Sequence, residues 1–311
     1  MHKNKTKTKS TRSNLFNVKL VFIIIFVIIF LSLLYGVIHF KIAVPDVVEI
    51  PQQIKKDVLN IKQTKEFYVP ILLYHYVEYV KDEGDTIRKS LNIVPIVFEE
   101  EVKTLKDAGF VFITPKDLAD LYDDKIKLPK KPIILTFDDG YRDFYTDVFP
   151  ILKKYNIKAI AYIVPNFLDK PNNLTSRQLK EIVQSGLVEI GAHTMNHTYL
   201  AGLPLKRVRS EIEESKKYLE EKTGIPIVSF AYPYGAFDNQ AIQVVKDVGF
   251  KTAVTTISGT LITDTNRYFL YRIRPGGRVG KNLLTLVDEK TFPGKRNTAV
   301  MGVSKNNFAG N

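Results

Sequence analysis

Residues 132–141 read PIILTFDDGY and give the strongest indication of the fold. The apolar run Pro132–Phe137 is short, uninterrupted and rich in branched side chains, which is typical of a buried strand. A helical pattern follows from Tyr141 to Tyr155. The same order recurs on both sides, with predicted strands over 69–74, 110–114, 159–164, 188–191, 227–231 and 251–255, and predicted helices over 97–108, 176–185, 205–222 and 239–248. This alternation predicts a parallel sheet.

Six or more strand–helix units indicate a closed or nearly closed barrel. The span from Val69 to Gly277 is short for an eightfold barrel. We therefore expect an α/β fold, a distorted and incomplete (β/α) barrel.

Composition limits the kinds of site that the chain can build. Of 311 residues, 45% are hydrophobic and 25% are charged, as in folded proteins. The absence of cysteine excludes disulfides and thiolate zinc sites. Any metal must therefore be held by histidine and carboxylate.

The N-terminal region has the pattern of a membrane anchor. Residues 20–38 (LVFIIIFVIIFLSLLYGVI) carry no charge over about 19 positions, close to the ~20 needed to cross a bilayer. The preceding tail holds six of the basic residues and no acid, so the positive-inside rule places it in the cytoplasm. A cleaved signal peptide is the alternative, although Ile42-Ala43-Val44 is a poor cleavage site.

These patterns predict a single-pass cell-membrane protein with an extracellular catalytic domain. We expect a basic cytoplasmic tail over 1–19, an anchor over 20–40, a stalk over 41–68, the catalytic domain over 69–287 and a loosely ordered tail over 288–311. Because much of the +12 net charge lies in the N-terminal tail, we expect no nucleic-acid partner. The sequence leaves protein partners open.

Two polar clusters follow predicted strands, where parallel barrels place their active sites. Adjacent carboxylates such as Asp138 and Asp139 raise each other's pKa, and a bound cation removes that cost. An Asp-Gly turn is the structural alternative. His193 and His197, four residues apart, can converge on a metal if the backbone between them is a helical turn. One Asp and two His would leave coordination positions open, as in catalytic sites.

Weaker candidates lie in other loops. His75 follows the run VPILLY and could be a general acid, or a structural residue. A backbone N–H of the 230–235 loop (FAYPYG) could face an oxyanion, although a Pro-Gly turn explains the same residues. Arg272 or Arg274 could orient a carboxylate. Because the chain has no Trp, sugar-stacking candidates are tyrosines: Tyr76, Tyr141, Tyr232 and Tyr234.

Together, TFDDGY, HTMNHTYL and PYG, in this order, resemble the motifs of the polysaccharide deacetylases of the NodB-homology type, carbohydrate esterase family 4. The resemblance covers about residues 69–277. It implies a distorted barrel and a divalent metal, usually zinc, with Asp139, His193 and His197 as ligands. It also implies that Asp138 is the general base and that the Tyr234 N–H helps to hold the oxyanion.

Two features depart from the family pattern. Ala231 stands where many members have an arginine, and no histidine follows His197, although a late general-acid histidine is usual. Residues 71–77 (ILLYHYV) resemble an early-strand motif of the branch that deacetylates poly-β-1,6-N-acetylglucosamine. This implies that His75 is the acid and that Arg272 or Arg274 replaces the missing arginine.

The resemblance thus implies a metal-dependent hydrolase that removes N-acetyl groups from an extracellular N-acetylated polysaccharide, with poly-β-1,6-N-acetylglucosamine as the expected substrate. Peptidoglycan deacetylation and polysaccharide O-acetyl esterase activity are the enzymatic alternatives. A non-catalytic carbohydrate-binding protein is the alternative of another class, and it would tolerate the loss of Asp138.

Overall fold

The computed structural model describes residues 66–82 and 84–288. The predicted cytoplasmic tail, the anchor, all but the end of the stalk and residues 289–311 lie outside this part of the chain. Within the described residues, no helix has the length and apolar character needed to cross a membrane. Residues 66–68, expected in the stalk, instead form strand β1 (Glu66–Tyr68), which pairs with β11 (Leu261–Thr263) of the folded domain.

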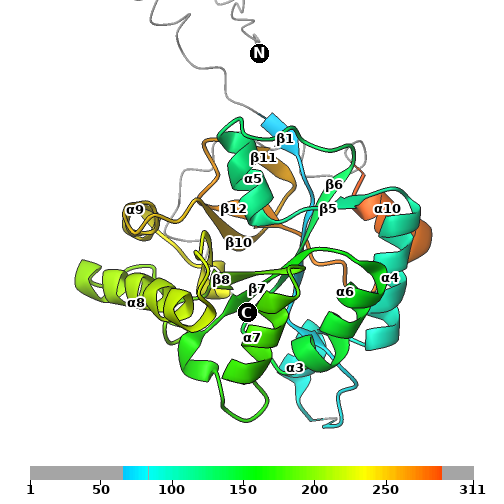
Figure 1. The fold of residues 1–311 in the computed structure, drawn as a ribbon, viewed down its shortest axis with the longest axis horizontal. Coiled ribbons are helices and arrows are strands. Elements are labelled where there is room, and N and C mark those ends of the chain that lie inside the picture. Colours follow the sequence, from blue (N-terminus) through cyan, green and yellow to red (C-terminus); the bar gives the residue numbers. More distant parts are fainter. Residues whose placement is uncertain (1–65, 83, 289–311) are drawn as a thin grey trace, which may run out of the picture. The chain divides into compact units, whose positions relative to one another are not determined.

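A ring of parallel strands forms the centre of the domain (Figure 1). Around the ring, the order is β2 (Ile71–Tyr74), β6 (Pro132–Phe137), β7 (Ala159–Ile163), β8 (Val188–Ala192), β9 (Ser229–Ala231), β10 (Thr252–Ser258) and β12 (Leu270–Arg272). The short β5 (Val111–Phe112) pairs with β6 outside this order. The predicted parallel sheet is therefore confirmed.

The barrel is nearly closed by contacts between its last and first strands. Ile273 forms a parallel bridge with Leu72. The Ile273 N–H donates to the carbonyl of Ile71, and the Leu73 N–H donates to the carbonyl of Ile273, each at 2.9 Å. These bonds bring residues 71–75 and 270–274 side by side.

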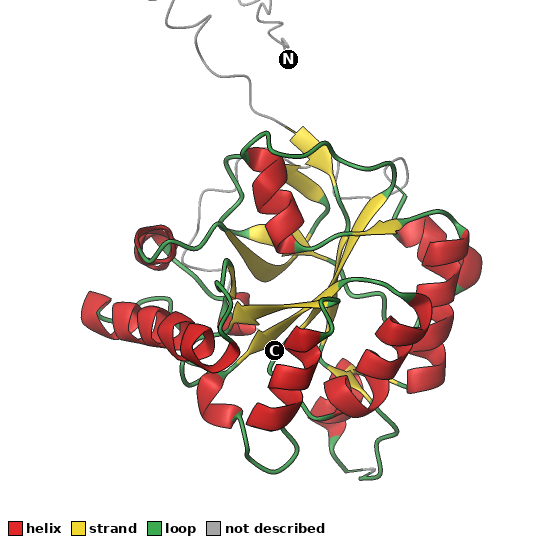
Figure 2. Cartoon of the chain, viewed as in Figure 1, coloured by secondary structure: helices red, strands yellow, loops and turns green. Residues whose placement is uncertain are grey.

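Helices surround this ring (Figure 2). They are α3 (Thr86–Leu91), α4 (Pro95–Asp107), α5 (Pro115–Tyr122), α6 (Phe149–Tyr155), α7 (Ser176–Gln184), α8 (Leu205–Thr223), α9 (Asn239–Asp247) and α10 (Gly280–Leu286). Capping boxes begin α5 at Thr114 and α7 at Thr175, and α8 ends at Gly224 in the left-handed conformation. The sequence predicted α4 and α6–α9 but missed α3, α5 and α10.

The helix predicted over 141–155 is confirmed from Phe144 on, but its first part is π-helical. A π-helical turn, η1 (Phe144–Val148), precedes α6, and the Phe149 N–H bonds to the carbonyl of Phe144 five residues earlier. Pro150 follows and has no N–H to donate. The wider turn is consistent with this missing donor.

Strand alternation separates two hydrophobic clusters and orients the site. Ile133, Leu135 and Phe137 of β6 face the surrounding helices, whereas Ile134 faces the barrel interior. The interior cluster also contains Leu118, Leu121 and Tyr122 of α5, which lies with β1 and β11 at the top of Figure 1. By the same alternation, Thr136 and Asp138 point inward at the opposite end of the strands.

Candidate active site

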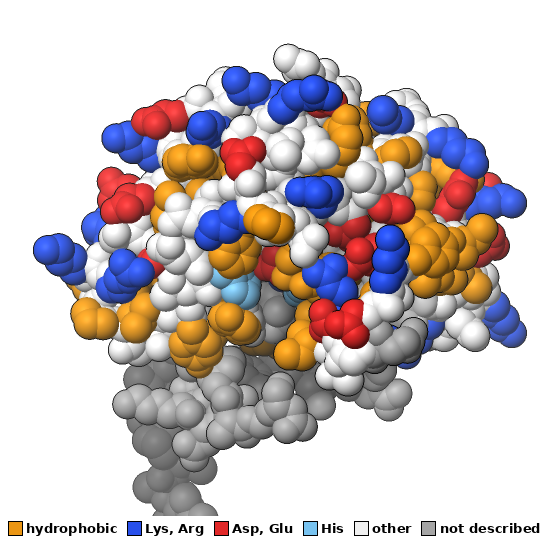
Figure 3. Space-filling view, turned by 90° about the horizontal axis from the view of Figure 1, so that it is seen from below, with side chains coloured by type: hydrophobic (Ala, Val, Ile, Leu, Met, Phe, Trp, Pro, Cys, Tyr) orange, Lys and Arg blue, Asp and Glu red, His pale blue; other side chains and the backbone are white. Residues whose placement is uncertain are grey.

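Most of the predicted catalytic residues gather where the strands end, on the face seen from below in Figure 3. His75 follows β2, Asp138 and Asp139 follow β6, and His193 follows β8. On this face, histidine side chains reach the surface between hydrophobic and charged side chains (Figure 3). The barrel thus assembles residues that lie far apart in the sequence.

Asp139, His193 and His197 form the candidate metal site. One ligand atom from each residue lies within 4.8 Å of the others. Asp139 Oδ1 is 3.3 Å from His193 Nε2 and 3.2 Å from His197 Nε2. This oxygen is buried and has no hydrogen-bond partner among the described residues. A buried, unsatisfied carboxylate oxygen that faces two imidazole nitrogens fits a divalent cation.

The local electrostatics keep Asp139 ionised. Burial alone would raise the pKa of this carboxyl, but His193 and His197 lower it, and the pKa lies well below its ordinary value. An ionised carboxylate is the form that binds a cation.

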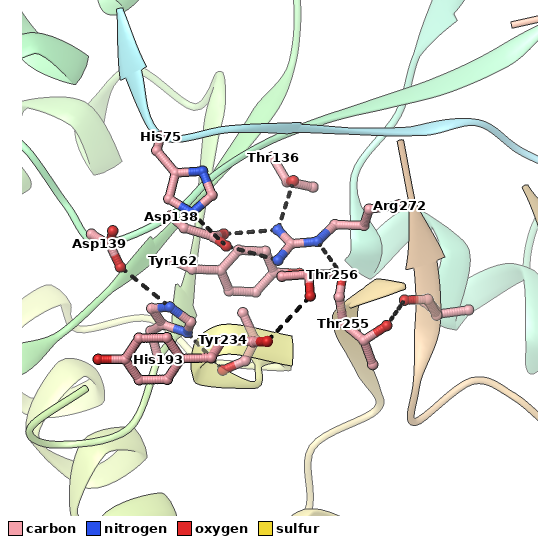
Figure 4. A network of polar contacts seen from close by, with 12 residues as sticks. His75, Thr136, Asp138, Asp139, Tyr162, His193, Tyr234, Thr255, Thr256 and Arg272 are labelled. Carbon is pink, nitrogen blue, oxygen red and sulfur yellow. Dashed lines mark hydrogen bonds and ion pairs between the residues drawn. The ribbon is translucent and has the colours of Figure 1, made fainter. Parts of the chain in front are cut away.

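The two histidines are oriented by contacts on their other ring nitrogens. His193 Nδ1 lies 2.7 Å from the carbonyl oxygen of Ala231. A carbonyl only accepts, so Nδ1 carries a hydrogen, and Nε2 is the ring nitrogen that faces Asp139 and could bind a cation (Figure 4). His197 Nδ1 lies 3.2 Å from the Tyr234 hydroxyl. Ala231, which replaces an expected arginine, therefore still positions a ligand through its backbone.

The backbone between the histidines is not the helical turn that we expected. Thr194 and His197 have φ values of 57° and 59°, in the left-handed region. The hydroxyl of Thr194 accepts a hydrogen bond from the Thr198 N–H at 2.9 Å, which stabilises this turn. The histidines converge as predicted, but through a different local structure.

Arg272 holds Asp138 through two parallel hydrogen bonds (Figure 4). Arg272 Nη1 donates to Asp138 Oδ1 at 2.8 Å, and Nη2 donates to Oδ2 at 2.7 Å. The guanidinium also donates to Thr136 Oγ1 at 3.0 Å and to the carbonyl of Thr255 at 2.7 Å. Burial would raise the pKa of Asp138, but the charge and hydrogen bonds of Arg272 lower it below its ordinary value.

Of the two arginines predicted to support the site, Arg272 is therefore the one that contacts Asp138. Arg274 lies at the exposed rim, and it forms no ion pair within the described part of the chain. Sequence reasoning missed Thr136. Its position two residues before Asp138, on the same strand face, was the available signal.

His75 lies beside Asp138, with its Nε2 atom 4.0 Å from Asp138 Oδ2. This separation is too long for a direct hydrogen bond. The side chain is 13% exposed, so a ligand at the barrel mouth can reach it. Burial lowers the pKa of His75 below its ordinary value, although Asp138 and Asp139 oppose that shift. His75 therefore lies at the site as expected, and its role as the acid stays a prediction.

The predicted sugar-stacking tyrosines do not all reach the site. Tyr232 is fully buried, and its hydroxyl donates to the carbonyl of Tyr268 at 3.0 Å. The prediction that it binds substrate is therefore wrong, since its ring belongs to the core. Tyr76 and Tyr141 stack on each other with centroids 4.0 Å apart, and Arg88 lies 4.4 Å from the Tyr76 centroid. Burial raises the pKa of both tyrosines, and the Asp139 carboxylate adds to that shift.

Tyr234 lies in a short 3-10 turn, η3 (Pro233–Gly235), with φ 60° and ψ 6°. Its side chain is 62% exposed. The oxyanion role of its N–H stays a prediction, because no contact of that N–H tests it.

Comparison with known proteins agrees with this geometry. A family described as "Polysaccharide deacetylase" matches residues 125–253. YxkH of Bacillus subtilis (strain 168), which its name classes with the polysaccharide deacetylases, is 32% identical over 214 residues, or 69% of this chain and 74% of YxkH. The poly-β-1,6-N-acetyl-D-glucosamine N-deacetylase of Staphylococcus aureus (strain MSSA476) is 28% identical over 198 residues, or 60% of this chain and 68% of that enzyme.

Among solved structures, the Streptococcus pyogenes deacetylase PplD, in complex with acetate, superposes with a TM-score of 0.67 at 29% identity. The match covers 72% of this chain and 100% of PplD.

Proposed function

Because the chain belongs to the polysaccharide deacetylase family, we propose that it removes N-acetyl groups from the N-acetylglucosamine units of poly-β-1,6-N-acetylglucosamine. The observation that carries this proposal is the position of His75, on the first barrel strand and beside Asp138. No histidine follows His197 that could supply an acid from a later strand. The similarity to the S. aureus enzyme supports the same substrate.

We further propose a divalent cation, zinc, at Asp139, His193 and His197, since one carboxylate and two imidazoles suit this ion. When bound, the cation would polarise the acetyl carbonyl and lower the pKa of a water molecule. The domain would work outside the cell, anchored by residues 20–40.

Asp138 is the proposed base. Its bonds to Arg272 keep it ionised and fix both oxygens, yet a carboxylate retains further lone pairs for a water proton. As the water oxygen forms a bond to the acetyl carbon, Asp138 takes one proton. The Tyr234 N–H donates to the carbonyl oxygen, where negative charge develops.

His75 is the proposed acid. An amine leaves readily only after its nitrogen gains a proton, so the C–N bond breaks as His75 donates one. Acetate and a glucosamine unit result. Burial lowers the pKa of His75, whereas the nearby Asp138 and Asp139 carboxylates favour its protonated form.

The test is acetate release by the full chain in detergent from β-1,6-linked N-acetylglucosamine oligomers. We expect release with zinc, loss with a chelator, and loss in Asp138→Asn and His75→Ala. The matched control is Asp107→Asn, which changes an exposed aspartate on α4.

Other outcomes would overturn the proposal in distinct ways. Release from peptidoglycan or from an O-acetylated polymer, but not from the oligomers, would contradict the substrate. Oligomer binding without any release, unchanged in Asp138→Asn, would indicate a carbohydrate-binding protein.

A further inference from the structure

Two exposed tyrosine rings lie next to the candidate metal site. Tyr234 is 62% exposed and Tyr199 is 41% exposed. Their centroids are 6.3 Å apart with the planes tilted by 38°, and the Tyr234 ring lies 4.6 Å from that of His197. Isolated exposed aromatic residues need no explanation, but two neighbouring rings beside a metal ligand form a local apolar surface.

The backbone holds the Tyr234 ring in this exposed position. A left-handed conformation is unusual for a bulky side chain and is costly, by about 1–3 kcal/mol. The Gly235 N–H donates to the carbonyl of Tyr232 at 2.8 Å, and Thr256 Oγ1 donates to the carbonyl of Tyr234 at 3.2 Å. A Cβ atom on Gly235 would come within 2.1 Å of Thr256 Oγ1, so the turn requires glycine there.

This strain is not offset by burial of the ring, because Tyr234 remains 62% exposed. Strained conformations persist at functional sites, where they position a group for a ligand. The Tyr234 hydroxyl contacts His197 Nδ1 at 3.2 Å, yet the residue remains 62% exposed, so its ring can also contact a ligand.

The other tyrosines near the site have occupied faces. Tyr232 is in the core, and Tyr76 is covered by Tyr141 on one side and approached by Arg88. The chain has no Trp. Tyr199 and Tyr234 are thus the exposed aromatic rings found beside the metal site within the described residues.

We propose that Tyr199 and Tyr234 stack on a second sugar of the polymer while the acetamide of the neighbouring sugar lies at Asp139, His193 and His197. This inference rests on the proposed function and deepens it, since it predicts that the site recognises at least two linked sugars. The apolar C–H face of a pyranose suits an aromatic surface, and the ring hydroxyls stay in solvent.

The experiment compares a β-1,6-linked N-acetylglucosamine tetramer with the monomer, using the zinc-loaded full chain. We expect Tyr199→Ala to raise KM for the tetramer about threefold to tenfold, the range of one aromatic contact. We expect kcat to stay within about twofold, because Tyr199 touches no reacting atom, and KM for the monomer to stay the same.

Matched variants separate stacking from folding. Tyr199→Phe keeps the ring and should retain the wild-type KM. Tyr199→Leu keeps apolar bulk without a ring, so it should behave like Tyr199→Ala and serves if the alanine variant does not fold. The stacking proposal is overturned if the tetramer KM is unchanged in both the alanine and the leucine variant. It is also overturned if these variants raise KM equally for the tetramer and the monomer.

Direct binding distinguishes this failure from failure of the proposed reaction. The tetramer affinity is measured by calorimetry in an Asp138→Asn background, with and without Tyr199→Leu. If the wild type releases no acetate but Tyr199→Leu weakens tetramer binding, the proposed deacetylation is wrong and the proposed stacking on Tyr199 is supported. If acetate is released and Tyr199→Leu binds the tetramer as tightly as the parent, the proposed stacking is wrong and the proposed deacetylation is supported.

Discussion

Replacing Arg272 with methionine would leave the Asp138 carboxylate buried without its partner. Asp138 is 3% exposed and Arg272 is 1% exposed, and their two hydrogen bonds measure 2.8 and 2.7 Å. Breaking a buried, hydrogen-bonded ion pair by removing one member costs about 3–5 kcal/mol, because the remaining charge is uncompensated. Methionine retains apolar volume, so the expected loss reports mainly the missing charge and hydrogen bonds.

The assay is urea unfolding at neutral pH, followed by circular dichroism, in parallel with acetate release. We expect Arg272→Met to lower the free energy of unfolding by about 3–5 kcal/mol and to abolish acetate release. The double variant Asp138→Asn/Arg272→Met should regain part of the stability, since the buried charge is gone, but none of the activity.

Arg274→Met is the matched control. This arginine lies two residues further along and at the rim, so a change within about 0.5 kcal/mol is expected. A loss below about 1 kcal/mol in Arg272→Met, or an equal loss in Arg274→Met, would refute the assignment of Arg272 as the partner of the base.

Asp139→Asn should lose bound zinc, measured by elemental analysis after dialysis, whereas Asp107→Asn should retain it; equal zinc in both would contradict the ligand set. His75→Ala should lower kcat about 10²–10⁴-fold on an N-acetylated oligomer. The loss should be much smaller on an O-acetylated oligomer, because an alkoxide leaves more readily than an unprotonated amine. Equal losses of kcat on the two substrates would argue against an acid role. Buried Glu101 accepts from the Tyr74 hydroxyl at 2.9 Å, and burial raises its pKa to about 8. The raised pKa contributes stability that is fully present below the unfolded pKa of about 4.3 and is lost as the pH rises to about 8. In urea unfolding, Glu101→Gln should therefore be more stable than the wild type by about 3–5 kcal/mol at pH 9 and similar to it at pH 4. A stability difference that does not change with pH would contradict the raised pKa.

Local patterns were sufficient to predict which residues gather at the candidate metal site. Asp138, Asp139 and His193 follow strands whose apolar runs are plain in the sequence. Parallel strands bring their carboxyl ends to one face, so residues that follow different strands must meet there. The inward direction of Asp138 follows from the same alternation that buries Ile134.

The features that could not be predicted depend on distant contacts or on rare backbone conformations. Arg272 and Arg274 share a strand face, and only the pairing of Ile273 with residues 71–73 decides which of them reaches Asp138. The sequence of residues 231–235 (AYPYG) does not indicate that Tyr232 is buried and Tyr234 exposed, because these orientations depend on the positive φ of Tyr234. The same limit explains why the helical turn predicted between His193 and His197 was wrong, since a positive φ at a non-glycine residue has no clear sequence signal.

The near closure of the barrel links catalysis to the order of folding. His75 follows the first barrel strand, and Arg272, on the last, reaches Asp138 across a sequence separation of 134 residues. Contacts between distant segments form slowly, because a long loop must be ordered before they stabilise the chain. A chain that stops before β12 would leave the edge of β2 unpaired and Asp138 without its guanidinium. Enzymatic activity should therefore appear only with the last folding step, later than the bulk of the secondary structure.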